Sequence, residues 1–271
     1  MELLKTYDLW DIQPDSEIPP IVLASFPVNF EELEVNNKKR AFFHSLLPVA
    51  MIALSEIESE RATVEYILNK LQSAGVGGKI DFSDNGDWTV ILDSVELDFL
   101  RHLTAKYRTS DSQVLLKRVN VIPISLIMAQ GAIESSWGSS RFALEGNNLF
   151  GIWTWGKNGI VPALREEGLN HKIAIYPSIL ESVRDYILVL NRHQAYSKFR
   201  DLRNQSFDPI TLVDGLIKYS ERREDYIRDV KRMIRSNELQ RFDSYLLTSQ
   251  LDDPDGLMNM MFLRKNLNVV I

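Results

Sequence analysis

The chain has 271 residues, of which 45% are hydrophobic and 25% are charged, and its formal net charge is -6. This is the composition of a folded globular protein with enough chain for a sizeable core, so collagen-like, low-complexity and largely disordered architectures are excluded. The excess of acidic residues argues against a broad nucleic-acid-binding surface. The absence of cysteine excludes disulfides, thiolate zinc sites and a cysteine nucleophile.

The first 71 residues predict an extended arm followed by a long helix. Residues 1–30 hold four prolines and few helical signals, so we expect them to lie as an arm along the body. In residues 31–71 apolar side chains recur every three or four positions, as on one face of a helix, and Pro48 is expected to kink that helix or split it in two. The longest fully apolar run, residues 46–54, is too short to span a membrane, and residues 1–8 lack the basic-then-apolar pattern of a leader.

The middle of the chain predicts a hairpin and two helices. An Asn-Gly pair at positions 85–86 stands between the apolar runs 80–82 and 88–92. Asn-Gly between such runs is the strongest short-range signal for a two-stranded hairpin. Residues 95–107 and 112–119 then have the pattern of two short helices.

The second half of the chain combines helices with one small β lobe. Pro123 suits the first turn of a helix that runs to about Ser136. Residues 150–176 are rich in β-branched and aromatic side chains with glycine breaks, which predicts a hairpin lobe. Further helical patterns cover residues 139–145, a segment that begins at Ser178, and residues 209–219 and 225–237. The predicted fold class is therefore α+β and mostly α.

Glu134 is the first candidate functional residue, because it lies in the last turn of a helix that is apolar nearly all round. The partial negative charge of a helix C-terminus and apolar surroundings both disfavour a carboxylate, so we expect a raised pKa for Glu134. A carboxylic acid that stays protonated near neutral pH can donate its proton to a leaving oxygen, as glycoside hydrolysis requires. The alternative is a structural role, in which Glu134 caps the helix or pairs with an arginine such as Arg141.

The motifs around Glu134 are similar to those of a known enzyme family. Glu-Ser-x-Trp-Gly occupies residues 134–138 and Asn-Asn-Leu-Phe-Gly occupies residues 147–151, and the likeness continues through residues 176–196 and 215–237. In these motifs the chain resembles bacterial endo-β-N-acetylglucosaminidases of the flagellar-muramidase-like group, glycoside hydrolase family 73, and among them the Bax-type proteins. The likeness covers roughly residues 20–240.

The resemblance implies a lysozyme-like fold and cleavage of the β-1,4 bond after N-acetylglucosamine in peptidoglycan glycan strands. It implies that Glu134 is the general acid, and that Tyr219, on the opposite wall of a cleft, supports the sugar in the reactive subsite. Where the family uses a second carboxylate, it comes from the β lobe, and the candidates here are Glu166 and Glu167. Neighbours on a strand point to opposite faces, and we favour Glu166. Both could instead be solvated, with the substrate's own N-acetyl group offsetting the charge on the sugar.

Aromatic rings and amides match the apolar faces and hydroxyl edges of sugars. We predict that the substrate-binding residues are Trp153, Trp155, Asn148, Tyr176 and Glu167, although each aromatic ring could instead belong to the core. The four histidines have no metal-ligand spacing, and no phosphate-binding loop is present. The resemblance implies neither a metal nor a cofactor.

These signals divide the chain into an N-terminal arm and helical extension (residues 1–110), a glucosaminidase domain (111–240) and a C-terminal tail (241–271). The resemblance implies a periplasmic or extracellular location in a bacterium. It also implies peptidoglycan as the partner. The charge balance argues against nucleic acid as a partner, the length of the longest apolar run argues against a membrane span, and the oligomeric state stays open. Two alternatives stay open, a lytic transglycosylase on the same fold and a peptidoglycan-binding scaffold without catalysis.

Overall fold

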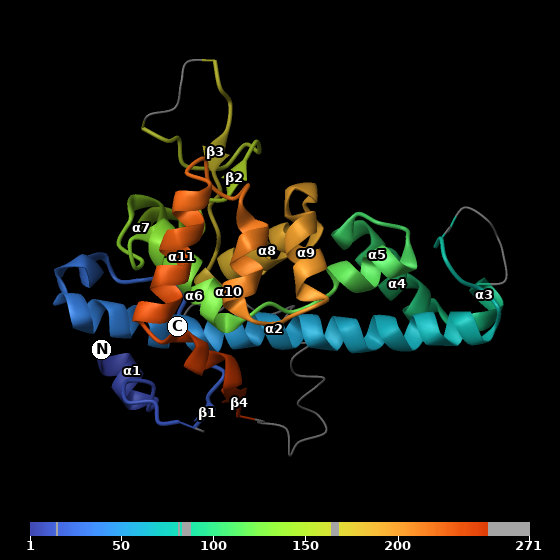
Figure 1. The fold of residues 1–271 in the computed structure, drawn as a ribbon, viewed down its shortest axis with the longest axis horizontal. Coiled ribbons are helices and arrows are strands. Elements are labelled where there is room, and N and C mark those ends of the chain that lie inside the picture. Colours follow the sequence, from blue (N-terminus) through green and yellow to red (C-terminus); the bar gives the residue numbers. More distant parts are fainter. Residues whose placement is uncertain (15, 81, 83–87, 164–167, 249–271) are drawn as a thin grey trace.

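A long central helix, α2 (Val35–Ser73), organises the molecule, and the other elements are arranged along it (Figure 1). The computed structural model describes residues 1–14, 16–80, 82, 88–163 and 168–248. Over the first half of α2 lie α6 (Ile124–Ser135), α7 (Arg141–Gly146), α8 (Ile179–Arg192), α9 (Ser197–Arg203), α10 (Pro209–Leu212) and α11 (Glu224–Ser236). Over its second half lie α3 (Trp88–Ile91), α4 (Ser94–Tyr107) and α5 (Ser112–Arg118).

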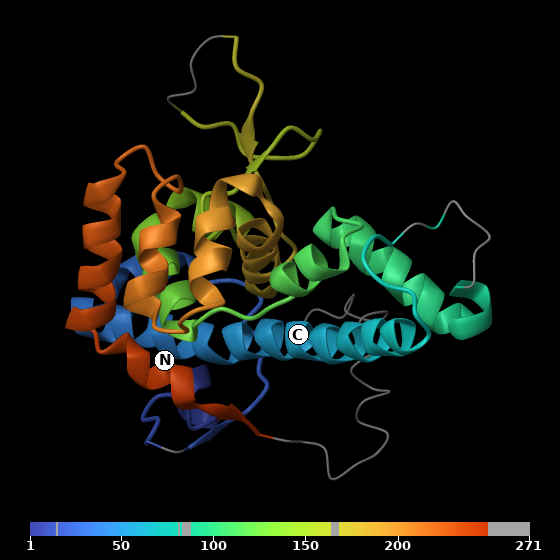
Figure 2. The same ribbon diagram turned by 45° about the vertical axis from the view of Figure 1, so that its right-hand side comes forward.

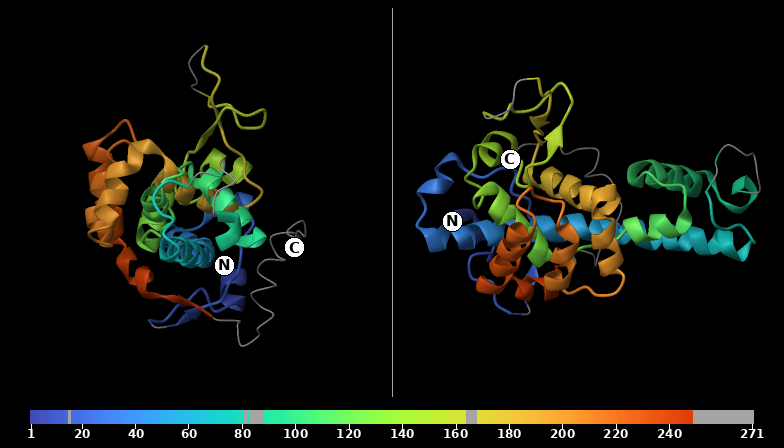
Figure 3. Two further views of the ribbon diagram at one scale, coloured as in Figure 1. Left: turned by 90° about the vertical axis from the view of Figure 1, so that its right-hand side faces the viewer. Right: turned by 45° about the horizontal axis from the view of Figure 1, so that its top comes forward.

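Four short 3-10 segments and two small sheets complete the described fold. The 3-10 segments are η1 (Val28–Glu32), η2 (Gln194–Tyr196), η3 (Val213–Leu216) and η4 (Leu239–Ser244). β1 (Glu17–Ile18) pairs in parallel with β4 (Leu246–Leu247), and β2 (Trp153–Thr154) pairs antiparallel with β3 (Lys172–Ile173). The second pair forms a lobe that stands out from the helical body in two views (Figures 2 and 3). The predicted fold class, mostly helical with a β-hairpin lobe and an N-terminal helical extension, is confirmed.

Helix α2 is buried in two different ways along its length. Every residue from Ala41 to Leu54 is buried, because α6 and α8 pack on one side of this stretch and the N-terminal arm lies on the other. Beyond Leu54 the buried residues recur as a single stripe that faces α4 and α5, namely Ile57, Glu60, Val64, Ile67 and Leu71. The sequence pattern predicted one apolar stripe, and only the second half of α2 has that simple pattern.

The split expected at Pro48 does not occur, and α2 continues through this residue. Proline removes one helical hydrogen bond and crowds the preceding turn. Here Pro48 lies within the stretch that is buried all round, so tertiary packing holds the helix together.

Helix α2 also corrects the expectation drawn from the longest apolar run. Its length and hydropathy would allow it to cross a membrane, but 78% of its most apolar window is buried inside the protein. The core helix of a folded domain meets the same criterion of length and hydropathy.

The N-terminal arm is extended for most of its length, as predicted, but it begins with the short helix α1 (Glu2–Thr6). Its apolar side chains reach the core at Leu4, Leu9, Ile18, Phe26 and Phe30. The pairing of β1 with β4 joins the arm to residues 246–247 near the other end of the described chain. The arm is therefore an integral layer of the fold.

The predicted hairpin over residues 80–92 is wrong where it can be compared. Residues 88–91 form α3 rather than a strand, and the Asn-Gly pair at positions 85–86 lies outside the described residues. Helix α3 contacts α2 and α4, and Ile91 at its end is half-buried while the next residue, Leu92, is buried. A helical turn therefore lets this apolar segment pack against the two neighbouring helices. On the other side of the pair, Lys79 forms an isolated bridge with Asp111.

The helices of the second half are tightly packed at Gly215 in η3. A Cβ atom built on Gly215 would lie 2.3 Å from the Cα atom and 2.6 Å from the backbone nitrogen of Phe199 in α9. Backbone atoms cannot move aside as the end of a side chain can, so only glycine fits. This contact sets the position of the segment that carries Tyr219.

We predict that Gly215→Ala destabilises the protein by roughly 2–4 kcal/mol, because the added methyl group overlaps the α9 backbone. Urea unfolding followed by circular dichroism measures the change. Gly77→Ala is the matched control, since a Cβ atom at Gly77 meets nothing within 4 Å, and its effect should stay within about 0.5 kcal/mol. Equal stability of the two variants would contradict this account of the packing.

Candidate active site

Glu134 lies in the last turn of α6, and a rigid turn follows it. The Ser135 hydroxyl accepts a hydrogen bond from the Gly138 N–H at 2.8 Å and donates one to a backbone carbonyl one turn earlier. Ser136 and Trp137 both have left-handed backbones, with φ of 52° and 56°, and Gly138 follows at 77°. The helix ends before the predicted terminator, and the turn fixes the direction in which the end of α6 points.

The Glu134 carboxyl is half-buried, and this burial raises its pKa above the ordinary value. Two neighbours oppose the shift and lower the pKa, namely the hydrogen-bonding Tyr226 hydroxyl and the positive charge of Arg222. The alternative pairing with Arg141 does not occur, since Arg141 bonds Glu145 at 3.1 Å on the exposed surface. The predicted direction of the pKa shift is confirmed, and burial is its main cause.

A chain of hydrogen bonds from three elements orients the group that bonds Glu134. Tyr186 in α8 donates to the side-chain oxygen of Gln130, and the Gln130 amide nitrogen donates to the Tyr226 hydroxyl at 2.8 Å. The Tyr226 oxygen is thereby an acceptor from Gln130, so its own proton is free to be donated to Glu134. Gln130 and Tyr186 are fully buried, so this network has little freedom to rearrange.

Tyr219 and the Asn-Asn-Leu-Phe-Gly segment lie beside the same carboxyl. The Tyr219 hydroxyl donates to the Phe150 carbonyl at 3.0 Å, and its ring stacks on Tyr226 with centroids 5.6 Å apart. A Cβ atom on the next residue, Gly151, would lie 3.9 Å from Oε2 of Glu134. The structure therefore brings together two predicted residues, Glu134 and Tyr219, around one backbone segment.

The structure gives Asn148 a different role from the predicted substrate contact. Its side chain is 1% exposed. Its amide nitrogen donates to the carbonyls of Ile152 and Ala174, and its amide oxygen accepts from the N–H groups of Phe150 and Ile152. Since all of these bonds are internal, Asn148 anchors the base of the β lobe to the helical body.

Tyr176 lies at the other end of this anchor and is also held by internal contacts. Its hydroxyl donates to Asp185 at 2.6 Å, and its backbone bonds Gly146 and the Asn147 side chain. Burial and the nearby Asp185 carboxylate raise the pKa of Tyr176. Its ring is half-buried, so the predicted sugar contact of Tyr176 stays a prediction.

The remaining predicted residues belong to the β lobe. Trp153 and Trp155 are 53% and 72% exposed, and their rings lie 6.4 Å apart in an edge-to-face arrangement. Trp153 also stacks on His171 with centroids 4.3 Å apart. Exposed indole rings on a protruding lobe are available to a ligand. Glu166 and Glu167 lie outside the described residues, so the second carboxylate stays a prediction.

Comparison with known proteins finds a family match over the part of the chain that carries Glu134. Residues 110–239 match the glucosaminidase family, described as mannosyl-glycoprotein endo-β-N-acetylglucosaminidase. Protein bax of Escherichia coli is 26% identical over 212 residues, which are 74% of this chain and 70% of that protein. Residues 110–239 are therefore a glucosaminidase-family domain, and the chain as a whole is Bax-like. It is accordingly a glycoside hydrolase.

Other relatives match a smaller share of the chain. The peptidoglycan hydrolase FlgJ of Salmonella typhimurium is 30% identical over 113 residues, which are 37% of this chain and 34% of that protein. Among solved structures, the chain is similar to the catalytic domain of the autolysin Auto from Listeria monocytogenes, with 22% sequence identity and a TM-score of 0.38. The match covers 56% of this chain and 89% of the Auto chain. The part of FlgJ that aligns with this chain is about a third of the length of FlgJ.

Three residues of the site were not predicted from the sequence of this Bax-type glucosaminidase, namely Gln130, Tyr186 and Tyr226. One signal was present, because Gln130 stands one turn before Glu134 on the same helix face. A buried amide needs hydrogen-bond partners, so its position on an apolar helix indicated a polar network. Its partners lie 56 and 96 residues away along the chain and carry no local signal. In the part of the chain that the structure describes, no cluster of acidic, histidine or cysteine side chains could hold a metal ion.

We predict that Tyr226→Phe raises the pKa of Glu134 further, because the hydroxyl that favours the carboxylate is removed while burial is retained. Carbon NMR of labelled glutamate carboxyl groups measures the titration, and the Glu134 signal is the one lost in Glu134→Gln. Tyr107→Phe is the matched control, because the Tyr107 hydroxyl is buried and bonds Glu60. A Glu134 pKa that stays constant or falls in Tyr226→Phe would contradict the network.

Proposed function

We propose that this chain hydrolyses peptidoglycan glycan strands at the β-1,4 bond that follows N-acetylglucosamine, with Glu134 as the general acid. The observation that carries the proposal is a half-buried carboxyl with a raised pKa that forms no ion pair with a described residue. A group of this kind can be protonated near neutral pH and still reach a substrate. The family membership supports a glucosaminidase activity, and the FlgJ relative is itself a peptidoglycan hydrolase.

The reaction begins with proton transfer from the Glu134 carboxyl to the glycosidic oxygen as the bond from that oxygen to the anomeric carbon breaks. The sugar passes through an oxocarbenium-like state, water adds to the anomeric carbon, and the water's proton leaves to a base. That base is either a β-lobe carboxylate, for which Glu166 is favoured over Glu167, or Glu134 itself when the N-acetyl group of the substrate offsets the positive charge.

The other site residues divide into those that contact sugar and those that hold Glu134. Tyr219 supports the sugar in the reactive subsite, with its hydroxyl held at the Phe150 carbonyl. Trp153 and Trp155 offer exposed ring faces for neighbouring sugars, and Tyr176 is a further contact at the base of the lobe. Tyr226, oriented through Gln130, holds the Glu134 carboxyl in place. A peptidoglycan substrate places the working enzyme in the periplasm or outside the cell.

We predict that Glu134→Gln lowers the release of reducing ends from purified sacculi by a factor of roughly 10²–10⁴, because the amide has no acidic proton to donate. Circular dichroism and thermal unfolding should show an intact fold. Glu145→Gln is the matched control, since Glu145 is a nearby acid that is exposed and paired with Arg141. Full activity of Glu134→Gln would remove the assignment, whereas loss of activity in both variants would point to damage of the fold.

We also predict that the digestion products carry a hydrated N-acetylglucosamine at the new reducing end. Mass spectrometry of the released fragments, with digestion in heavy-oxygen water, detects the solvent oxygen gained at the cleaved bond. An anhydro-N-acetylmuramic acid end without solvent oxygen would identify a lytic transglycosylase instead. Binding to sacculi without any soluble product would identify a scaffold without catalysis.

A further inference from the structure

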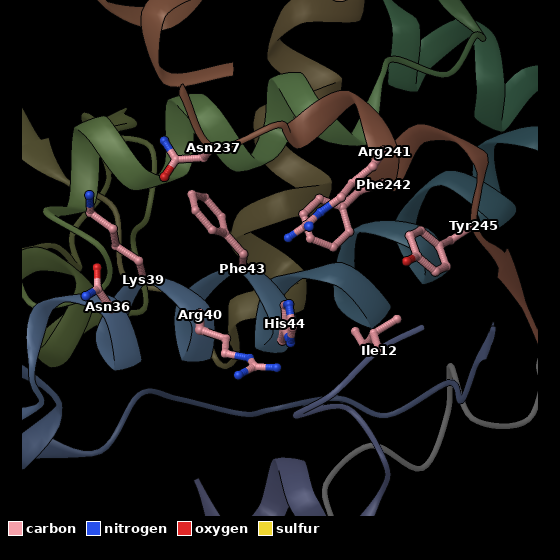
Figure 4. A pocket seen from close by; sticks show the side chains of 10 residues that line it. All are labelled: Ile12, Asn36, Lys39, Arg40, Phe43, His44, Asn237, Arg241, Phe242 and Tyr245. Atoms are coloured by element: carbon pink, nitrogen blue, oxygen red, sulfur yellow. The ribbon is translucent and has the colours of Figure 1, made fainter. Parts of the chain in front are cut away.

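A cavity of about 420 Å³ lies between the N-terminal arm, the start of α2 and the segment around η4 (Figure 4). Neither Glu134 nor Tyr219 lines it, so it is separate from the proposed active site. Its walls combine basic, amide and apolar side chains. The lining residues are Ile12, Asn36, Lys39, Arg40, Phe43, His44, Asn237, Arg241, Phe242 and Tyr245.

The charged side chains among the lining residues of this cavity are all basic. In Figure 4, Lys39 rises from α2 toward Asn237 and Arg241 points from η4 toward Phe43, so both head groups border the same space. Neither forms an ion pair with a described residue; the Lys39 ammonium lies 5.3 Å from the centre of the Trp137 ring, and the Arg241 guanidinium lies over Phe242. No aspartate or glutamate is among the lining residues.

The other two basic side chains of the lining, Arg40 and His44, already have partners within the protein. Arg40 points toward the arm and pairs with Asp11, so a carboxylate of the arm is bound at the edge of the cavity. Burial lowers the pKa of His44 to about 4, and its Nδ1 atom lies 2.8 Å from the Leu9 carbonyl oxygen, so His44 is neutral at physiological pH. Lys39 and Arg241 are therefore the two cations left without a carboxylate.

Lys39 and Arg241 differ from basic residues near this cavity that are paired with carboxylates, such as Arg40. On neighbouring α11, for comparison, Arg222 pairs with Asp229 and Lys231 pairs with Asp214. Two like charges held near one cavity repel each other, and an anionic ligand relieves that repulsion. The planar fork of an arginine suits a carboxylate, and the Arg40–Asp11 pair uses this chemistry at the same cavity.

We propose that this cavity is a binding site for an acidic peptide, with its carboxylates on Lys39 and Arg241 and its backbone on the Asn36 amide and the Asn237 amide oxygen. The Asn237 amide nitrogen already donates to the Met233 carbonyl at 3.0 Å. The half-buried ring of Tyr245 offers apolar surface for the intervening side chains of the peptide. Because the site is separate from Glu134, the proposal does not depend on the glycosidase mechanism.

The test is isothermal titration calorimetry of the full chain with an N-acetylated hexapeptide of alternating aspartate and leucine at low ionic strength. We expect saturable binding that weakens as salt is added. The double variant Lys39→Gln/Arg241→Gln should weaken it by about tenfold or more, because two ligand charges lose their partners. The double variant Lys198→Gln/Arg108→Gln is the matched control, since both residues are exposed and in no ion pair with a described residue. Binding to the control should change by less than about twofold.

Two further control experiments test which chemical groups of the ligand are recognised. The same hexapeptide with asparagine in place of aspartate should not bind, and inorganic phosphate or phosphatidylglycerol vesicles should not displace the acidic peptide at matched charge. The proposal is overturned if the wild-type chain does not bind the peptide, if the cavity variant binds it as tightly as the control, or if phosphate or vesicles displace it. Thermal unfolding of all variants establishes that a loss of binding reflects the cavity rather than the fold.

Discussion

The candidate site depends on one feature, which is a carboxyl group at the end of a buried helix, where burial raises its pKa and where it forms no ion pair with a described residue. Burial of Glu134 raises the pKa of its side chain, and Arg141, the arginine that the sequence offered as its partner, is bonded to Glu145 instead. The left-handed turn after α6 and the backbone at Gly151 keep the carboxyl at the edge of the core. An acid in this position can be both protonated and accessible.

The long helix α2 provides the support for this arrangement. Its first half is buried on all sides, and α6 and α8 pack against it. Helix α6 carries Gln130 and Glu134, and α8 carries Tyr186, so a shift of α2 would disrupt the packing that positions these residues. The N-terminal arm closes the opposite side of α2 through its buried apolar residues. The predicted division into an extension and a glucosaminidase domain is untested, but the core is continuous across residue 110.

The sequence predicts those features that have a local pattern and misses those that depend on distant contacts. The periodicity of α6, the hairpin lobe and the position of Glu134 are all local. The split at Pro48 and the strand at residues 88–92 are local preferences that burial against neighbouring helices overrides. Asn148 shows a different limit, because an asparagine amide can hydrogen-bond a sugar or backbone groups equally well. Only the fold shows that Asn148 bonds four backbone groups. The bond between Tyr226 and Gln130 joins helices 96 residues apart, and no short window of sequence contains it.

The charge of Arg222 lowers the pKa of Glu134, whereas burial raises it. Its charge favours the carboxylate, and an arginine placed directly on Glu134 would hold that group ionised and unable to donate a proton. The Arg222 guanidinium instead forms an ion pair with Asp229 in α11, and Arg222 lies on the exposed surface. Arg222 therefore lowers the Glu134 pKa through its charge without forming an ion pair with Glu134, and the Asp229 carboxylate offsets part of that charge. The Tyr226 hydroxyl, which carries no charge, makes the direct contact, so it can orient the carboxyl while burial still keeps the pKa of Glu134 raised.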